Sequence, residues 1–525
     1  MSGTESPVGV RDVVICASLG SLSGIIASTG GTFSAVGIPS FERDENAPFI
    51  MGESEKAAFN SVLLLAMTFG PIVGPFMTTL EGPRTILLLL LLPIIASWLM
   101  LAFGDTIYVF FISRTILGMC GGISSSIGQI YLTEITSVEV RGFISSTGML
   151  AQCWYAFIGS VAALFLSWRG LAILNAVLMT VHLLLAFLFP ESPTWLLRKS
   201  TEMKARRALT FLRGKENVEV ELLDLQSRVA KSKVHSQKFL DLLDRKYAKA
   251  LFVLFVIAAL RQLSGAFVVF SYTVEIFESA GSRLSSTLST VIISAVQLIV
   301  NFLSNGLTDR IGRKKLYVSS AILSGLSQTA FGAYYYQLHK NPAAAEKFHW
   351  VPLLTLILFS VAFSFGLASS IFVLRTELIP MNVRDSASTV MSVFNNFACF
   401  LTVQYYYSMR SSLTEAGVFW FYGAACIAVG IFCLLVLPET NGKSLDELEE
   451  AFAVKKPPKN DSEDELKSSE VRLDSEFVET ADRSELELDA SSEEFSSNEE
   501  ELEEVMNAEV DDGNSNDSRC AAGSS

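Results

Sequence analysis

Long apolar stretches separated by short polar connections fill the chain up to about residue 440. A helix that crosses a bilayer needs about 20 predominantly apolar residues, and roughly twelve stretches reach that length. The pattern therefore predicts an all-α membrane protein with twelve transmembrane helices. The expected spans are residues 13–36, 57–78, 85–104, 107–130, 143–167, 169–189, 250–274, 286–306, 316–337, 351–374, 387–408 and 416–437.

One long polar segment, residues 191–249, interrupts this pattern between the sixth and seventh spans. It holds fourteen Lys or Arg residues and is expected to form short cytosolic helices. The spans on its two sides are expected to form two six-helix bundles. The expected domains are a cytosolic N-terminus at 1–12, a first bundle at 13–190, the linker at 191–249, a second bundle at 250–437 and a cytosolic tail at 438–525.

The positions of basic residues predict the orientation of the chain in the membrane. Lys and Arg in short connections are retained on the cytosolic side, whereas acidic residues have little influence. The even-numbered connections and the linker are rich in basic residues, and the odd-numbered connections are poor in them. Both termini are therefore expected to be cytosolic.

Two sequence patterns recur at matching helix ends in the two halves, which indicates an internal duplication. Glu stands seven residues before Arg after the fourth and the tenth span, and Pro-Glu follows the sixth and the twelfth. Duplicated halves of this kind enclose a substrate site near the middle of the bilayer. The matched pairs are Glu134–Arg141 with Glu377–Arg384, and Pro190–Glu191 with Pro438–Glu439.

Charged residues at the cytosolic helix ends are candidates for a gate. Pairs formed across the two halves would close the inner mouth while the outer mouth is open. The alternative interpretation is snorkelling at the interface combined with orientation signals. The candidate gate residues are Glu134, Arg141, Glu191, Asp309, Arg310, Arg313, Glu377, Arg384 and Glu439.

Composition separates the membrane part from an acidic tail. The chain is 50% hydrophobic and 18% charged, with a mean hydropathy of +0.41, which excludes a secreted enzyme or a nucleic-acid binder. Residues 461–525 hold 23 Asp or Glu against 4 Lys or Arg, a charge of −19, so the rest of the chain is mildly basic although the net charge is −14. The tail is expected to be disordered from about residue 453, as a solvated spacer or as a segment that binds a cytosolic protein or kinase.

The sequence contains no recognisable catalytic or metal-binding constellation. There is no phosphate-binding Gly loop with its Lys, no cluster of His and Cys, and no nucleophile elbow. We therefore expect neither enzymatic activity nor a cofactor or metal, and the expected partners are a small molecule and the lipid bilayer.

Five motifs at successive helix ends resemble the signature set of the sugar transporter family within the major facilitator superfamily. The resemblance covers about residues 13–450 and implies the major facilitator fold, plasma-membrane location and sugar transport by alternating access. Within the family, the chain is similar to arthropod facilitated trehalose transporters, so trehalose or a hexose is the expected cargo. The motifs are Tyr131-Leu-Thr-Glu134 with Arg141-Gly142, Pro190-Glu191-Ser192-Pro193-Thr-Trp195-Leu196, Gln262-Leu263-Ser264-Gly265, Asp309-Arg310-Ile-Gly312-Arg313-Lys314, and Pro438-Glu439-Thr440-Asn-Gly442-Lys443.

The resemblance also implies sugar-binding residues. Gln152 in the fifth span and Gln262 in the seventh match the family's sugar-binding glutamines, while Gln297 and Asn395 fall on sugar-contacting positions of the eighth and eleventh spans. An amide offers donors and acceptors to neighbouring hydroxyls and stays uncharged in the membrane. The alternative for each residue is a hydrogen bond between helices of the bundle.

The chain departs from the family at several places, one of which is the loop Glu81-Gly82-Pro83-Arg84, a degraded version of the motif at Asp309–Arg313. Arg261 replaces the first glutamine of the seventh-span motif, and Phe267 replaces a sugar-contacting asparagine. A buried Arg is costly unless it is paired or lines a wet cavity, so Arg261 is expected to pair with an acid or to bind an anionic substrate. The tenth span has Gly366 and a Ser pair where the family has a proline-containing hinge, so flexibility there would come from these residues.

The mode of transport follows from the first span. Proton-driven relatives carry an acid in the middle of this helix, whereas residues 20–30 contain no ionisable side chain. Downhill, uncoupled transport is therefore expected. Two other functions stay open: an organic-anion carrier that uses Arg261, and a nutrient sensor without flux that signals through the acidic tail.

Overall fold

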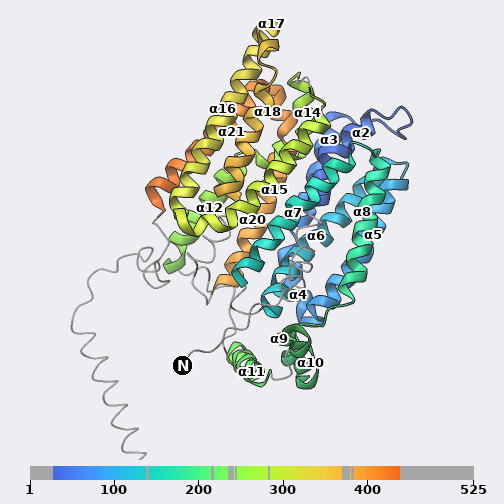
Figure 1. Cartoon of the computed structure of the whole chain (residues 1–525), viewed down its shortest axis with the longest axis vertical. Helices are drawn as coiled ribbons and strands as arrows, with labels where there is room; N and C mark the ends of the chain where they lie inside the picture. Colours follow the sequence, from blue (N-terminus) through green and yellow to red (C-terminus); the bar gives the residue numbers. More distant parts are fainter. Residues whose placement is uncertain are drawn as a thin grey trace, which may run out of the picture. The chain divides into compact units, whose positions relative to one another are not determined.

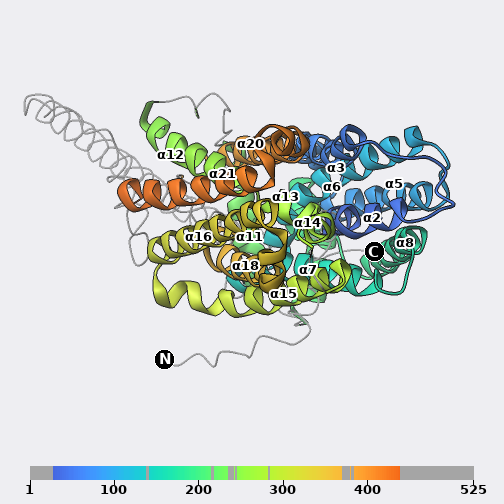
Figure 2. The same cartoon turned by 90° about the horizontal axis from the view of Figure 1, so that it is seen from above.

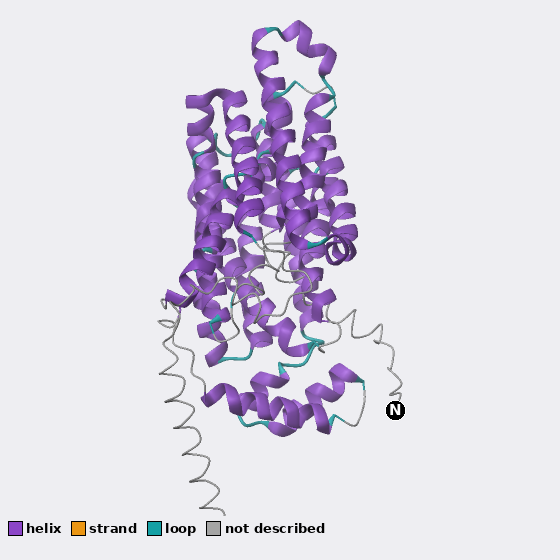
Figure 3. Cartoon of the chain, turned by 90° about the vertical axis from the view of Figure 1, so that its left-hand side faces the viewer, coloured by secondary structure: helices purple, strands orange, loops and turns teal. Residues whose placement is uncertain are grey.

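The computed structural model describes residues 28–136, 141–214, 218–234, 242, 245–281, 284–368, 379 and 383–437, with some helical side chains left undescribed. This part of the chain is almost entirely helical (Figure 3). In lipid, a helix satisfies its own backbone N–H and C=O groups, which is why the long apolar stretches adopt this structure. The acidic tail lies outside the described residues.

The first half and the linker contain short and long helices in the order expected from the apolar stretches. The π-helix η1 and helix α2 form the described end of the first span, and α9 to α11 form the linker. The elements are η1 (Phe33–Gly37), α2 (Ile38–Glu42), α3 (Glu53–Met67), α4 (Gly70–Leu80), α5 (Pro83–Phe103), α6 (Ile107–Ile135), α7 (Arg141–Ala162), α8 (Trp168–Ala186), α9 (Pro193–Arg198), α10 (Glu202–Arg213) and α11 (Glu219–Val234).

The second half repeats this pattern with more interruptions. Its seventh and tenth spans are each divided, and α21 contains the end of the eleventh span, a turn at Thr414 (φ 64°) and the twelfth span. The elements are α12 (Arg245–Gln262), α13 (Ala266–Ser271), α14 (Thr273–Ser279), α15 (Ser286–Ile311), α16 (Arg313–Lys340), α17 (Pro342–Ala345), η3 (Glu346–Phe348), α18 (Val351–Ala362), η4 (Phe363–Ala368), α20 (Arg384–Gln404) and α21 (Tyr406–Val436).

Helix is present at each of the twelve positions where the sequence predicts a span. Among the described residues, eight helices are long and apolar enough to cross a membrane, or up to nine if the bent pair α3 and α4 is one span. Seen from above, the helices of the first half group together and those of the second half lie beside them (Figure 2). The two bundles meet where α7 packs against α15 and where α3 packs against α20.

Close glycine contacts hold the second span against the fourth. A Cβ atom added to Gly70 would lie 2.0 Å from the main-chain carbon of Gly122, and one added to Gly118 would lie 2.3 Å from the Leu63 carbonyl oxygen. Lipid supplies no hydrophobic force that drives helices together, so dispersion contacts between close backbones matter more than in water. The glycines therefore set the distance between these helices.

The linker helices form a small unit at one end of the first bundle (Figure 1). Leu196, Leu209 and Leu222, from α9, α10 and α11, belong to an apolar cluster of their own. Trp195 Nε1 donates to the Thr78 carbonyl at 2.9 Å, and Arg213 Nη1 donates to the Ile135 carbonyl at 3.0 Å. These bonds tie the linker to the ends of α4 and α6, and we call this end of the bundles the linker end.

Candidate functional site

The seventh span breaks immediately after the two residues that the sequence singles out. Helix α12 ends at Gln262, and Gly265 adopts a left-handed conformation (φ 70°) before α13 begins. A Cβ atom on Gly265 would lie 2.3 Å from the Tyr422 ring, so glycine is required for space as well as for conformation. Arg261 and Gln262 therefore stand at a helix end inside the membrane, where main-chain polar groups are available to bind ligands.

Three of the five predicted binding residues form one hydrogen-bonded cluster. Gln262 Nε2 donates to Asn395 Oδ1 at 2.7 Å and to the Asn395 carbonyl at 3.3 Å. Arg261 Nη1 donates to the same Asn395 Oδ1 at 3.3 Å. Gln262 is 3% exposed, Arg261 is 8% exposed and Asn395 is partly buried. We call these three residues the buried amide cluster.

The tenth span contributes a π-helix to this region in place of a proline hinge. The Leu367 carbonyl in η4 accepts a hydrogen bond from Arg261 Nε at 2.8 Å. Ser320 Oγ of α16 accepts from the Leu367 N–H at 3.0 Å and donates to the Ala362 carbonyl at 2.6 Å. Gly366 faces the Ser320 side chain closely, whereas the Ser pair that follows lies outside the described residues. Single π-helical turns are frequent at functional sites.

The other two predicted binding residues lie on neighbouring helices of opposite bundles. Gln152 is on α7 and Gln297 on α15, and both are partly buried. Among the described residues, no side-chain bond joins either of them to the buried amide cluster. Asn301, which the sequence analysis missed, donates to the Gln297 carbonyl at 2.8 Å and contacts Cys153 Sγ at 3.3 Å. A role of Gln152 and Gln297 in binding stays a prediction.

Asn396 links the two bundles at the break in the second span. Pro71 stands four residues after Met67 and has no N–H, so the Met67 carbonyl lacks its helical donor. Asn396 Nδ2 of α20 donates to this carbonyl at 3.2 Å. The bond satisfies a main-chain group that the helix break releases, and it connects α20 to the opposite bundle one residue after Asn395.

Arg114 is a second buried guanidinium that the sequence analysis missed. It lies on α6 with 0% exposure, donates to the Gly30 carbonyl at 2.8 Å and to Ser34 Oγ at 3.0 Å, and lies 4.3 Å from the Phe59 ring centroid. Its position inside an apolar span is a signal that the sequence carries, since a buried Arg is costly unless it is paired. These contacts tie α6 to the first span, where Ser34 belongs to η1.

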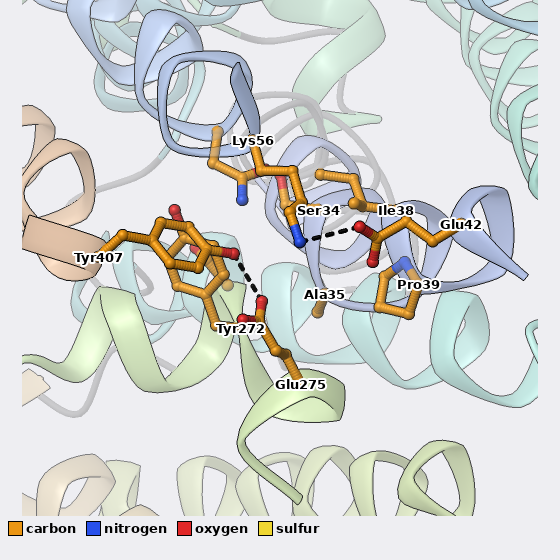
Figure 4. Close-up of a pocket in the computed structure, with 11 residues that line it drawn as sticks. Ser34, Ala35, Ile38, Pro39, Glu42, Lys56, Tyr272, Glu275 and Tyr407 are labelled. Carbon is orange, nitrogen blue, oxygen red and sulfur yellow. Dashed lines mark hydrogen bonds and ion pairs between the residues drawn. The ribbon is translucent and has the colours of Figure 1, made fainter. Parts of the chain in front are cut away.

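A small cavity lies between the bundles at the end opposite the linker (Figure 4). Lys56 of α3 is 2.8 Å from Glu42 Oε1, and its Nζ atom lies 5.7 Å from the Tyr407 ring centroid of the second half. Tyr407 Oη donates in turn to Glu275 Oε2 at 2.6 Å. None of the five predicted binding residues lines this cavity.

The loop after α2 contributes a charged group at the same end. The Trp168 indole donates to Asp44 Oδ2 at 2.9 Å, and the Asn46 N–H donates to Asp44 Oδ1 at 3.0 Å. These hydrogen bonds hold the pKa of the Asp44 carboxyl below its ordinary value. The bond to Trp168 ties the loop to the first residue of α8.

The family model of the sugar (and other) transporters matches residues 21–452, which is most of the chain. The chain belongs to this sugar transporter family. It is 31% identical over 453 residues to the facilitated trehalose transporter Tret1 of Anopheles gambiae, covering 85% of this chain and 56% of that protein. It is 30% identical over 458 residues to Tret1 of Apis mellifera ligustica, covering 86% of this chain and 90% of that protein.

The fold of this sugar transporter family member is that of the major facilitator superfamily, and the described helices lie in two bundles. The inward-open structure of the xylose transporter XylE from E. coli superposes with a TM-score of 0.68 at 20% identity, covering 83% of this chain and 98% of that one. The fold class predicted from the sequence is thereby confirmed. The chain is an integral, multi-pass membrane protein.

At the linker end, Glu134 and Glu191 have partners from the linker and from the first bundle. Glu134 Oε2 accepts from Ser192 Oγ at 2.6 Å, and Glu134 Oε1 lies 3.7 Å from Arg198. Glu191 accepts from the main-chain N–H groups of Arg84 and Thr85 at 3.0 and 3.2 Å, which caps the start of α5. Arg313 begins α16.

Pairing of the gate residues across the two halves stays a prediction. Glu377 and Glu439 lie outside the described residues, and the side chains of the four others also do. These four are Arg141, Asp309, Arg310 and Arg384.

Two contacts between the bundles of this family member differ in how far their side chains are buried. Ser61 Oγ of α3 is 1% exposed as a residue and donates to Gln404 Oε1 of α20 at 2.5 Å. Arg43 pairs with Glu278 across the bundles, but these side chains are 55% and 44% exposed. The buried hydrogen bond is worth about 1 kcal/mol, and an exposed ion pair is worth about 0–1 kcal/mol.

We expect Ser61→Ala to open the end opposite the linker more often, by about five-fold, because it removes the bond to Gln404. Labelling of a cysteine placed at Ser271, which lines the cavity, by a membrane-impermeant thiol reagent measures this opening. Glu278→Gln is the matched comparison and should change the labelling rate by less than about two-fold. A larger effect of Glu278→Gln would show that the surface ion pair controls this end.

Proposed function

We propose that this protein carries out facilitated, uncoupled transport of a sugar, with trehalose or a hexose as the cargo, by alternating access between its two bundles. The observation that carries the proposal is the buried amide cluster at the broken seventh span. Gln262 and Asn395 offer neutral donors and acceptors inside the membrane, which suits the hydroxyl groups of a polyol. Relatives named as facilitated trehalose transporters support the same cargo.

The orientation and location belong to the same proposal. Basic residues concentrate in the linker and in the even-numbered connections, which favours a cytosolic linker end and cytosolic termini. The cavity of Lys56 and Tyr407 then faces the outside. We place the protein in the plasma membrane, where a sugar carrier exchanges cargo with the surroundings of the cell.

Residues 28–36, the described part of the predicted span 13–36, contain no acid, which supports uncoupled transport. Arg114 donates there to a main-chain carbonyl and to a serine hydroxyl, both of which are neutral. One structural neighbour is named a proton:xylose symporter, so the coupling of this chain needs its own test. A proton-driven carrier requires a group that loads and releases a proton as access alternates.

Uptake of labelled trehalose, glucose and fructose into reconstituted vesicles tests the proposal. We expect at least one sugar to equilibrate at a rate that is the same with and without a pH gradient. Empty vesicles are the control. Accumulation of sugar above the external concentration only when the outside is acidic would contradict uncoupled transport, and no uptake of any sugar would contradict the proposed function.

A further inference from the structure

Arg261 occupies a buried position whose partners are neutral oxygens. Its guanidinium donates to the Leu367 carbonyl at 2.8 Å and to Asn395 Oδ1 at 3.3 Å, and its Cζ atom lies 5.6 Å from the Phe363 ring centroid. The residue also lies in the last turn of α12, where the helix dipole favours a positive charge. Among the described residues, the groups that stabilise this cation are therefore neutral.

The hydrogen bonds of Arg261 restrict the orientation of the Asn395 amide. A guanidinium has donors only, so it can face the oxygen of an amide but not its NH2 group. Asn395 Oδ1 accepts from Arg261 and from Gln262, which uses both of its lone pairs. The Asn395 NH2 group must therefore point away from Arg261, and Gln262 must turn its own NH2 group toward Asn395.

The remaining atoms of this pair define what the site offers to a ligand. Within the described part of the chain, Nδ2 of Asn395 takes part in none of these bonds, and the bonds to Asn395 use only Nε2 of Gln262. The Gln262 side chain also contacts the Cys399 thiol, and its Oε1 has two lone pairs. Asn395 thus offers two donors, and Gln262 offers an acceptor. With a glutamine at position 261, as in the family motif, both amides could reverse together, since a glutamine can donate or accept.

Arg114 shows that this chain uses a buried guanidinium in the same structural way in its first half. It binds the Gly30 carbonyl and Ser34 beside the π-helix η1, as Arg261 binds the Leu367 carbonyl within the π-helix η4. In the first half the Arg lies on the fourth span and contacts the first. In the second half the Arg lies on the first span of that half and contacts the fourth.

We propose that Arg261 is a positioning residue that does not touch the sugar but fixes the amides of Asn395 and Gln262. The site then distinguishes two neighbouring hydroxyls of the cargo: one accepts from Asn395 Nδ2, and the other donates to Gln262 Oε1. This inference rests on the proposed sugar transport. It replaces both sequence-based expectations for Arg261, because its bonds are to a carbonyl and an amide oxygen.

Deoxy and fluoro analogues of the transported sugar, used as competitors of uptake, test the proposal. Fluorine accepts a hydrogen bond weakly but cannot donate one. We call the hydroxyl that donates to Gln262 Oε1 the donating position. In the wild-type protein, both analogues changed at this position should compete about ten-fold more weakly than the parent sugar. We call the neighbouring hydroxyl, which accepts from Asn395 Nδ2, the accepting position. There the deoxy analogue should also compete about ten-fold more weakly than the parent sugar, whereas the fluoro analogue should compete within about three-fold of it.

Arg261→Gln should give the same pattern of competition by fluoro and deoxy analogues at both ring positions. It should also raise KM for the sugar by about three- to ten-fold with little change in maximal rate. Arg261→Lys, which keeps a hydrogen-bond donor, should preserve part of the difference between the two ring positions. Asn395→Asp is a second variant that retains an acceptor for Arg261 and Gln262 but has no NH2 group. At the accepting position, Asn395→Asp should make the fluoro analogue as weak a competitor as the deoxy analogue. At the donating position, both analogues should compete as they do with the wild-type protein.

The outcomes separate this proposal from the proposed function. Failure of the wild-type protein to transport any sugar contradicts the function itself. Normal sugar transport with an identical analogue pattern in Arg261→Gln and in the wild type would overturn the positioning role. Competition by carboxylates that Arg261→Gln abolishes would also overturn it, because Arg261 would then contact the substrate directly.

Discussion

Gln262→Ala is expected to reduce sugar uptake by at least about 30-fold while the protein still reaches the membrane. The substitution removes the acceptor that Gln262 offers to the cargo, and it also removes the 2.7 Å hydrogen bond that holds Asn395. One lost hydrogen bond costs about 1 kcal/mol, and a buried amide left without its partner costs a further 1–3 kcal/mol. Initial uptake rates, normalised to the amount of protein at the cell surface, measure the effect.

Gln328 provides a matched control for this substitution. It is also a buried glutamine of a membrane-spanning helix, with 1% exposure, and neither side-chain Nε2 nor Oε1 has a hydrogen-bond partner in the described part of the chain. Gln328→Leu should therefore leave uptake within about two-fold, since an unpaired buried polar group contributes nothing favourable. Equal losses in Gln328→Leu and Gln262→Ala would mean that general packing, not sugar binding, explains the result.

Gly70→Ala is expected to prevent stable folding, with a loss of about 3 kcal/mol or more. The added Cβ atom would lie 2.0 Å from the main-chain carbon of Gly122 and 2.4 Å from its Cα atom. A backbone cannot move aside as a flexible side chain does, so α4 and α6 would have to separate. Surface abundance and the midpoint of thermal unfolding in detergent measure the loss.

Gly31→Ala is the control for the glycine substitution. A Cβ atom at Gly31 meets nothing within 4 Å, so the same chemical change should leave surface abundance and the thermal midpoint close to the wild-type values. Alanine also has a higher helix propensity than glycine, which favours the variant slightly. Normal folding of Gly70→Ala would show that the crossing of α4 and α6 is looser than this structure indicates.

The sequence alone determined the order and approximate limits of the membrane helices in the described part of the chain. The bilayer imposes a length and an apolar composition on every span, so these properties are legible in the chain itself. The break in the second span also has a local signal, because Pro71 removes a helical donor. Arg114 also has a local signal, because it stands inside an apolar stretch, where a charged side chain is rare.

Only the tertiary structure decided which polar groups meet. Hydropathy gives the depth of a residue but not the direction of its side chain or its partner on another helix. Gln262 and Asn395 come together from spans that are 133 positions apart in the chain, whereas no side-chain bond joins Gln152 to them. The sequence predicted that Arg261 pairs with an acid or binds an anionic substrate, whereas its partners in the structure are a carbonyl of a π-helix and an amide oxygen. The packing of three helices determines which oxygens are within reach of the guanidinium, and the sequence does not reveal that packing.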